Sequence, residues 1–214
     1  MPNFETFPCF PLQLVIFPGE EVKLHIFEPR YLQLFTQLSD DGRSYLSLPV
    51  IDGKLCSRGT ETVLRSIDQR HAGGSLDVTV KGANLSVVQR VEDAKGDQLY
   101  SIALAKKLNL EVPSGQLADA VDLRDRAMEL ARLVGARTAF PAPNTAAYSF
   151  EIGKKVGLSV EQEYELLCLD HEPDRQKFLR KHLITALEMA SKGQEMKRRI
   201  QLNGHYRYLR LGKQ

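Results

Sequence analysis

The chain has 214 residues and a mass of 24.1 kDa, which is enough for one large domain or two small ones. Its hydrophobic content of 43%, its charged content of 26% and its net charge of +2 are ordinary for a globular protein, and they give no overall field that would select nucleic acid or a membrane. Prolines at positions 2, 8, 11 and 18 interrupt the apolar stretch at the N-terminus, so we expect no signal peptide, no membrane-spanning helix and a cytoplasmic protein.

The first half of the chain, about residues 10–112, mostly shows the period of two that is typical of strands. Turn signals such as Pro18-Gly19 and Asp52-Gly53 separate the apolar runs, and Gly82 is expected to end one of them. The pattern predicts about seven strands: Leu12–Phe17, Val22–Ile26, Leu46–Val50, Thr60–Ile67, Leu76–Val80, Leu85–Val91 and Leu99–Leu104. So many short strands need their edges covered, and a small closed or nearly closed barrel does this.

One helix is predicted inside this region. Pro29 suits its first turn, because the missing N–H is not needed there. Ser39-Asp40-Asp41-Gly42 is expected to end it. The apolar residues between these signals fall at i, i+3, i+4 and i+7 on one face: Tyr31, Leu34, Phe35 and Leu38.

From about residue 114 to 192 the pattern is mostly helical. A first helix carries Leu123 to Val134 and stops at Gly135. A second follows the predicted N-cap Asn144 and ends near Gly157. Ser159 and Gln162 form a capping-box pattern for a third helix, and Pro173 opens the last.

The segment from Lys192 to Gln214 differs in composition. It has seven basic residues and one acidic residue, a local charge of +6, which leaves −4 for the rest of the chain. Its candidate contacts to nucleic acid are Lys197, Arg198, Arg199 and Arg207, with Tyr206 and Tyr208 available for base stacking. The alternative, which we favour, is a solvated helix end whose charge pairs with the acidic remainder.

Motifs that would indicate an enzyme are missing from the sequence. It contains no G-x-x-x-x-G-K-[ST] loop, no G-x-S-x-G elbow and no H-E-x-x-H pair, so we expect no catalytic residues. Asp170-His171-Glu172 is the densest titratable cluster, and a helix start with acidic residues near its dipole is favoured over a metal or acid–base site. His25, on the polar side of a strand, is expected to be a lone surface histidine.

The three cysteines lie far apart in the sequence. Cys9, Cys56 and Cys168 form no C-x-x-C pair, so we expect no zinc site, and more generally no metal and no cofactor. An odd number of thiols without characteristic spacing suits a reducing compartment, where they serve as small buried side chains.

Two short runs near the N-terminus, Phe17-Pro18-Gly19 and Ile26-Phe27-Glu28-Pro29-Arg30-Tyr31, resemble the N-terminal, substrate-binding domain of Lon protease. Shorter matches follow at Gly74–Gly82 and at Gly157–Leu167. The resemblance implies an α+β fold, a PUA-like β pseudo-barrel over residues 1–112 followed by a helical bundle over 113–192. The basic tail, 193–214, lies outside the resemblance. The residues that carry the signature are Phe17, Pro18, Gly19, Ile26, Phe27, Glu28, Pro29, Arg30 and Tyr31.

These signature residues also have structural interpretations. Gly19 suits a turn with positive φ, Phe27 a core position, and Glu28 with Arg30 an ion pair that orients the helix. We favour these roles over direct contact with a ligand.

The same resemblance implies a non-enzymatic, protein- or peptide-binding module, with an adaptor role in protein quality control, since the ATPase and protease modules of Lon are missing. Its partners would be unfolded or tagged polypeptides, or a protease or chaperone. Binding would use an apolar groove between barrel and helices or an exposed strand edge, with Tyr31, Phe35 and Phe140 as candidate surface residues. The alternative is an RNA-binding module, by analogy with other PUA-like barrels.

Overall fold

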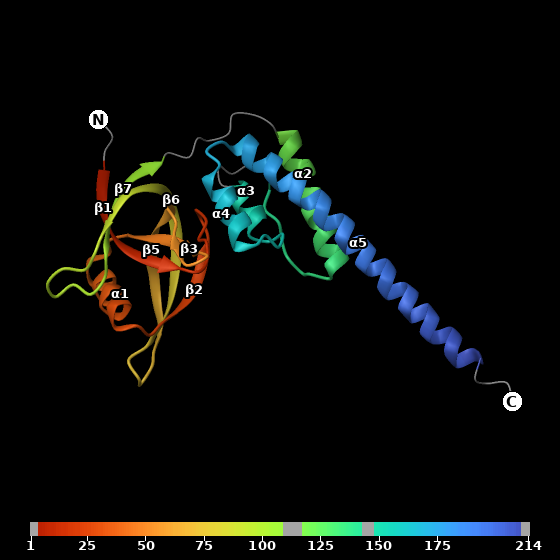
Figure 1. Ribbon diagram of the computed structural model, residues 1–214, viewed down its shortest axis with the longest axis horizontal. Helices are drawn as coiled ribbons and strands as arrows, with labels where there is room; N and C mark the ends of the chain where they lie inside the picture. Colours follow the sequence, from red (N-terminus) through yellow and green to blue (C-terminus); the bar gives the residue numbers. More distant parts are fainter. Residues whose placement is uncertain (1–3, 109–116, 143–147, 211–214) are drawn as a thin grey trace.

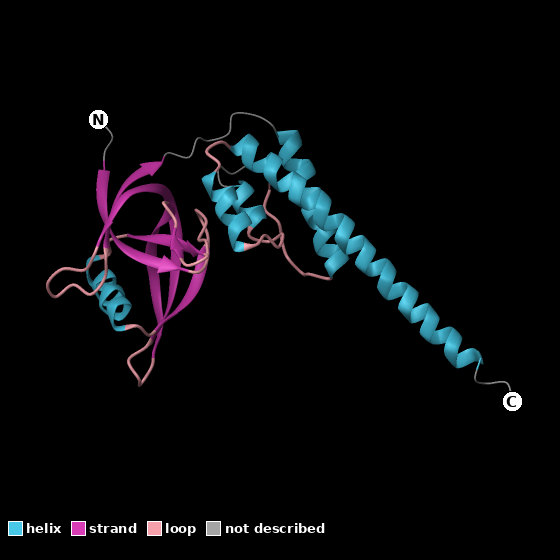
Figure 2. Ribbon diagram, in the orientation of Figure 1, coloured by secondary structure: helices cyan, strands magenta, loops and turns pink. Residues whose placement is uncertain are grey.

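The computed structural model describes residues 4–108, 117–142 and 148–210, and for 117–118 and 197–210 it describes the backbone alone. The strands gather in the N-terminal half and the helices follow on one side of it, apart from α1 (Pro29–Asp41), which lies against the strands (Figures 1 and 2). The last helix extends well beyond the rest of the molecule (Figure 1).

Hydrogen-bonded strands in the N-terminal half close into a ring. Strand β1 pairs antiparallel with β7 and parallel with β3, so the order β1–β7–β6–β5–β3 returns to β1. The predicted pseudo-barrel is therefore confirmed, and closure removes most of the free edges. The strands of this sheet are β1 (Phe4–Leu12), β2 (Glu21–Ile26), β3 (Tyr45–Ile51), β4 (Lys54–Leu55), β5 (Arg58–Arg70), β6 (Leu76–Glu92) and β7 (Ile102–Leu108).

The first strand lies earlier in the chain than the sequence predicts. The expected strand Leu12–Phe17 is wrong, because residues 13–17 form bends and irregular backbone. The apolar side chains in this segment are nevertheless buried: Val15, Ile16 and Phe17. Their apolar run therefore indicates burial in the core and not pairing in a sheet. The sequence pattern missed strand β1 because the strand contains Pro8 and Pro11, and a proline has no N–H to donate to a neighbouring strand.

Gly82 does not end a strand, as the sequence suggested. Strand β6 runs through it without a break from Leu76 to Glu92. A side chain at this position would overlap the carbonyl oxygen of Phe17. The turn after Phe17 lies directly on the glycine: Gly19 N donates to Gly82 O at 2.9 Å, and Gly82 N donates to Glu20 O at 2.9 Å. The missing Cβ thus allows two segments of backbone to touch.

Helix α1 matches its prediction at both ends. Pro29 occupies its first turn, and Gly42 ends it in a left-handed conformation with φ of 67°. Its predicted apolar face is buried, and the Phe35 ring lies 5.5 Å from the rings of both Phe10 and Tyr45. The helix therefore closes the barrel core.

Four helices are described in the C-terminal half: α2 (Leu117–Val134), α3 (Tyr148–Gly153), α4 (Val160–Cys168) and α5 (Glu172–Arg210). The predicted stop at Gly135 and the capping box are confirmed, with Gln162 N donating to Ser159 Oγ at 3.3 Å and Ser159 N to Gln162 Oε1 at 2.9 Å. The predicted cap Asn144 lies outside the described residues. Helix α3 ends at Gly153, before the expected Gly157.

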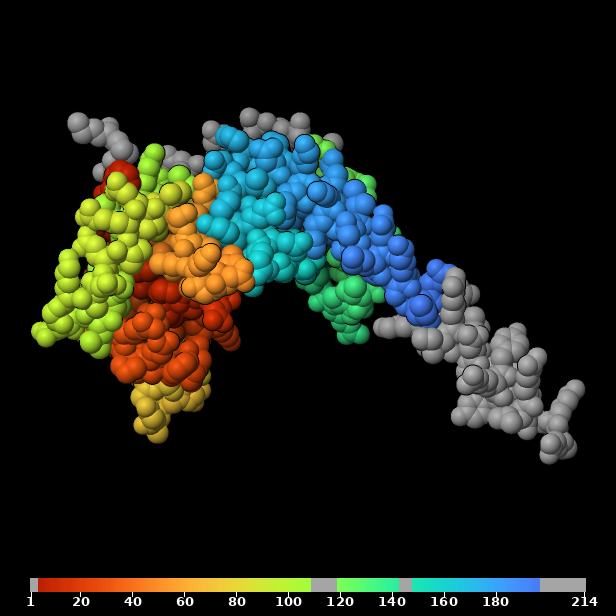
Figure 3. Space-filling model, in the orientation of Figure 1, coloured from red at the N-terminus to blue at the C-terminus, as the bar shows by residue number. Residues whose placement is uncertain are grey.

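A shared apolar core joins the barrel to the helices. The Phe17 ring stacks on the Phe150 ring at 5.1 Å between centroids. Arg58 of β5 donates to the carbonyl oxygens of Leu167 at 3.2 Å and Cys168 at 2.8 Å, and it pairs with Asp170 at 2.9 Å. The two halves therefore form one continuous surface (Figure 3).

Glu163 of α4 lies at this junction. Burial and, to a smaller extent, the charge of nearby Glu20 raise the pKa of its carboxyl group to about 7, against the opposing effect of Lys154. The ordinary value is 4.5, so between pH 4.5 and 7 the folded state binds more protons than the unfolded state. Stability should therefore fall across this window as the pH rises.

Replacing Glu163 with glutamine is expected to raise the free energy of unfolding by on the order of 1–2 kcal/mol at pH 8 and to leave it unchanged at pH 4. Below both pKa values the carboxyl is protonated in either state, so the uncharged amide changes little there. Urea unfolding at the two pH values measures the difference. The exposed Glu165→Gln on the same helix is the control, and an equal gain at both pH values would contradict the explanation.

Candidate functional site

Three apolar members of the N-terminal signature are core residues. Phe17 belongs to the core that joins barrel and helices, and Ile26 and Tyr31 belong to the barrel core. All three are buried. These side chains support the frame and are not available to a partner.

The other signature residues shape the turn and the helix start. Gly19 has φ of +83°, which favours glycine. Arg30 donates from Nη2 to Glu28 Oε2 at 2.7 Å, just where α1 begins. Phe27 differs from the expectation of a core position, because its side chain is 66% exposed.

The three residues predicted as a protein-binding surface lie in different places. Phe35 has no exposed surface and Tyr31 is buried, so both rings serve the barrel core. Phe140 is half-buried beside the helical core, with the Lys155 ammonium 5.8 Å from its ring centre. The structure does not bring Phe140 together with the other two.

A largely apolar hollow lies within the helical half, between α2 and α5. Its volume is about 710 Å³. The segment that follows α3 forms one side, where His182 Nε2 lies 2.9 Å from the Val156 carbonyl oxygen. Its apolar lining is Leu130, Ala131, Val134, Ala136, Val156, Ala186, Met189 and Ala190, and we call this hollow the α2–α5 groove.

The rim of the α2–α5 groove leaves large apolar side chains in water. Met189 is 69% exposed and Val134 is 61% exposed. Exposed apolar side chains beside a hollow are typical of a binding surface. Lys155 and Gln162 supply polar groups at the same rim. The sequence did not predict this groove. The apolar spacing indicates that each helix has an apolar face, but it does not show that α2 packs against α5.

No protein-family model matches the chain, and no curated protein matches it. Solved structures do. One is the Lon N-terminal domain protein from Xanthomonas campestris, with a TM-score of 0.64 and 23% identity over 84% of this chain and 98% of that chain. Another is the N-terminal domain of a Lon protease from the Mycobacterium avium complex, with a TM-score of 0.61, 15% identity and the same coverage of both chains. The chain has the fold of a Lon N-terminal domain.

In this Lon N-terminal fold, the neighbouring residues Asp170, His171 and Glu172 lie in different environments. Asp170 is exposed and pairs with Arg58. Glu172 is buried and accepts from Ser149 Oγ at 2.7 Å. His171 is exposed at the surface. Asp170 and Glu172 therefore interact with different residues, and these contacts do not support a single metal or acid–base site.

Two of the three thiols, those of Cys9 and Cys56, are not set up as nucleophiles. Burial raises the pKa of the Cys9 thiol to about 12, and burial also raises the pKa of Cys56. A thiol with a raised pKa is protonated at neutral pH, and the thiolate is the reactive form.

The predicted nucleic-acid contacts fall on the far end of α5. Lys197, Arg198, Arg199 and Arg207 lie within its backbone range, and their side chains are outside the described residues. Nucleic-acid binding by this segment therefore stays a prediction. Among the described residues, no helix combines the length and the apolarity needed to cross a membrane.

Proposed function

We propose that this chain is a non-enzymatic polypeptide-binding module, an adaptor that holds apolar segments of unfolded or tagged polypeptides for a protease or chaperone. The observation that carries the proposal is the α2–α5 groove with its exposed apolar rim. The Lon N-terminal fold supports the same function class.

The groove suits short apolar segments of an extended chain. Three of its lining residues are alanines, Ala131, Ala186 and Ala190, whose small side chains leave room for the side chains of a partner. A volume of about 710 Å³ is within the range of ligand pockets. Burying two or three apolar side chains contributes roughly 1.5–3 kcal/mol each before the cost of ordering the chain, which favours weak, reversible binding.

Met189 suits a surface that accepts many sequences. Its unbranched side chain can adapt to partners of different shape, and methionine is common at promiscuous binding surfaces. Lys155 at the rim can pair with a carboxylate of the bound chain. Apolar contact would thus supply affinity, with little demand on sequence.

Replacing Met189 with glutamate is expected to weaken binding of an unfolded polypeptide at least tenfold, because it places a charge where apolar side chains are buried. Fluorescence anisotropy with a labelled, reduced and alkylated model protein, which cannot refold, measures this. Met128→Glu is the matched control: Met128 lies on α2, is 52% exposed and does not line the groove.

Two results would contradict the proposal. One is no detectable binding by the unaltered protein up to several hundred micromolar. The other is an equal loss in both variants, which would show that general surface charge, and not the groove, governs binding.

A further inference from the structure

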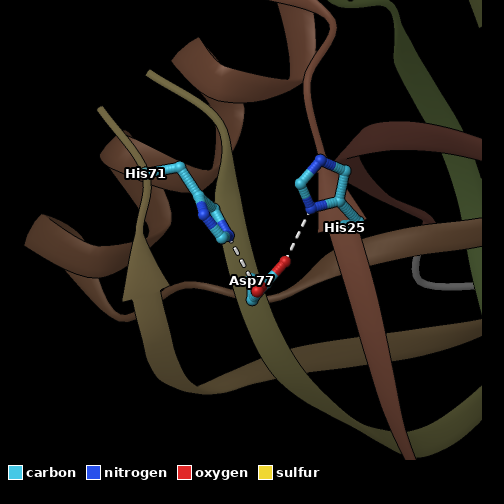
Figure 4. Close-up of side chains that lie close together, drawn as sticks. All are labelled: His25, His71 and Asp77. Carbon is cyan, nitrogen blue, oxygen red and sulfur yellow. Dashed lines mark hydrogen bonds and ion pairs between the residues drawn. The ribbon is translucent and has the colours of Figure 1, made fainter. Parts of the chain in front are cut away.

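Two histidines and an aspartate converge on the outer surface of the barrel, away from the α2–α5 groove. His25 of β2 stands directly opposite Asp77 of β6 in the strand register. His71 lies in the turn between β5 and β6. Figure 4 shows both rings pointing at the same carboxylate.

The distances show how tightly the three groups meet. His25 Nδ1 lies 2.6 Å from Asp77 Oδ1, and His71 Nε2 lies 2.8 Å from Asp77 Oδ2. One donor atom from each residue falls within 4.8 Å of the other two. Ligand atoms around a zinc ion sit about 3.3 Å apart, given bond lengths near 2.0–2.2 Å and tetrahedral geometry, so modest side-chain rotations suffice.

The backbone around the cluster is well held. His71 N donates to Ser75 O at 2.9 Å, and Gly74 N donates to His71 O at 2.9 Å, which closes the turn that presents the imidazole. The His25 ring stacks near Phe27 at 6.1 Å and meets the His71 ring edge-on at 5.5 Å. Both contacts limit the orientations that the rings can take.

Solvent can reach the cluster. The His25 side chain is 54% exposed, and His25 also lines a surface hollow of about 390 Å³ together with Phe27 and Tyr31. An ion could therefore enter without opening the fold. The exposed Phe27, which the core interpretation could not explain, forms part of this hollow.

We propose that His25, His71 and Asp77 bind one divalent transition-metal ion, with Zn²⁺ as the reference ion. Two imidazole nitrogens and a carboxylate oxygen are the donor set that suits Zn²⁺, Ni²⁺, Co²⁺ or Cu²⁺. Ca²⁺ and Mg²⁺ prefer sets made of oxygen ligands, so they are not expected. Three protein ligands leave one position of a tetrahedral zinc for water or an outside ligand.

On binding, the metal would replace the shared hydrogens of the two hydrogen bonds. A neutral imidazole that gives its Nδ1 or Nε2 lone pair to the metal carries its proton on the other ring nitrogen. The ion would then tie β2, β6 and the β5–β6 turn together. Sequence spacing could not reveal this site, since His25 and Asp77 are 52 positions apart.

The test is a zinc titration of the untagged, full-length protein after removal of metal with a chelator. Competition with a chromophoric zinc indicator should show one Zn²⁺ per chain with a Kd in the micromolar range or tighter. His71→Gln and Asp77→Asn should each weaken binding at least tenfold. His171→Gln, an exposed histidine outside the cluster, should leave the affinity unchanged.

A second readout separates loss of ligands from loss of fold. Saturating Zn²⁺ should raise the Tm of the unaltered protein and of His171→Gln, because the ion binds the folded state, and should not raise that of the cluster variants. Absence of saturable binding up to 100 µM Zn²⁺ would overturn the proposal. Unchanged affinity in the double variant His25→Gln/His71→Gln would overturn it as well.

Discussion

Replacing Arg175 with methionine is expected to lower the free energy of unfolding by about 3–5 kcal/mol, the cost of leaving one partner of a buried ion pair unpaired. Arg175 has no exposed surface, and Glu172 beside it is buried as well. Arg175 Nε lies 3.1 Å from Glu172 Oε2 and 3.0 Å from Ser149 Oγ. Without the guanidinium, the buried carboxylate would lose its cation.

The same side chain also holds the connection between α4 and α5. Arg175 Nη1 donates to the carbonyl oxygens of Leu169 at 2.9 Å and Asp170 at 3.0 Å, which lie between the two helices. Its guanidinium carbon is 4.8 Å from the centre of the Phe150 ring. Methionine fills similar volume but supplies none of these hydrogen bonds, so the connection between α4 and α5 should loosen.

Guanidinium chloride unfolding followed by circular dichroism measures the effect. Arg30→Met is the control, since Arg30 forms an exposed pair with Glu28 and should cost no more than about 1 kcal/mol. The double variant Arg175→Met/Glu172→Gln should recover part of the loss, because the unpaired charge is then removed as well. Equal small losses in Arg175→Met and Arg30→Met would contradict this role.

Replacing Gly82 with alanine is the second change with a large expected effect, a loss of about 3 kcal/mol, at the upper end of the cost of overpacking. The added methyl group would overlap the Phe17 carbonyl and approach the Ile16 side chain. To make room, the segment of residues 17–20 must lift from β6 and give up the hydrogen bonds to Gly82. Phe17 would then also lose its place against Phe150.

Thermal and chemical unfolding of Gly82→Ala test this directly. Gly73→Ala is the matched control, since nothing lies within 4 Å of its added methyl group and its φ is not in the left-handed region. The control should change stability by no more than about 0.5 kcal/mol. If Gly82→Ala were as stable as Gly73→Ala, the close crossing of backbone at β6 would be contradicted.

The sequence predicts the elements whose signals are local. The start of helix α1 at Pro29, its stop at Gly42 and its apolar spacing all lie within residues 29–42, and all three are confirmed. The capping box at Ser159 is equally local. The closed ring of strands was expected because many short strands need covered edges, and the pairing of β1 with both β3 and β7 provides that cover.

The misses occur where distant contacts decide the local structure. Val15 to Phe17 are apolar because they fill the core as irregular backbone, so their pattern looked like a buried strand. Gly82 looked like the end of a strand. A glycine is needed there because the carbonyl oxygen of Phe17, from another segment, lies where a side chain would be. Both errors concern the same crossing, which only the folded chain displays.

The candidate sites depend even more on distant contacts. The α2–α5 groove forms because α2 pairs with α5, and Met189 in the sequence is one apolar residue among many. His25 was expected to be a lone surface histidine, and the structure corrects this by placing Asp77 and His71 against it. The pairing register of β2 and β6 places His25 opposite Asp77, and the sequence of either strand alone does not reveal this register.

The most direct test of polypeptide binding in the α2–α5 groove is methyl NMR of the methionines. The chain has four methionines, and assignment by single substitution to leucine is straightforward. Titration with an unfolded model protein should shift or broaden the Met189 methyl signal, while the signal of Met128 should stay in place. Binding that perturbs Met128 and leaves Met189 unchanged would contradict the groove as the binding surface.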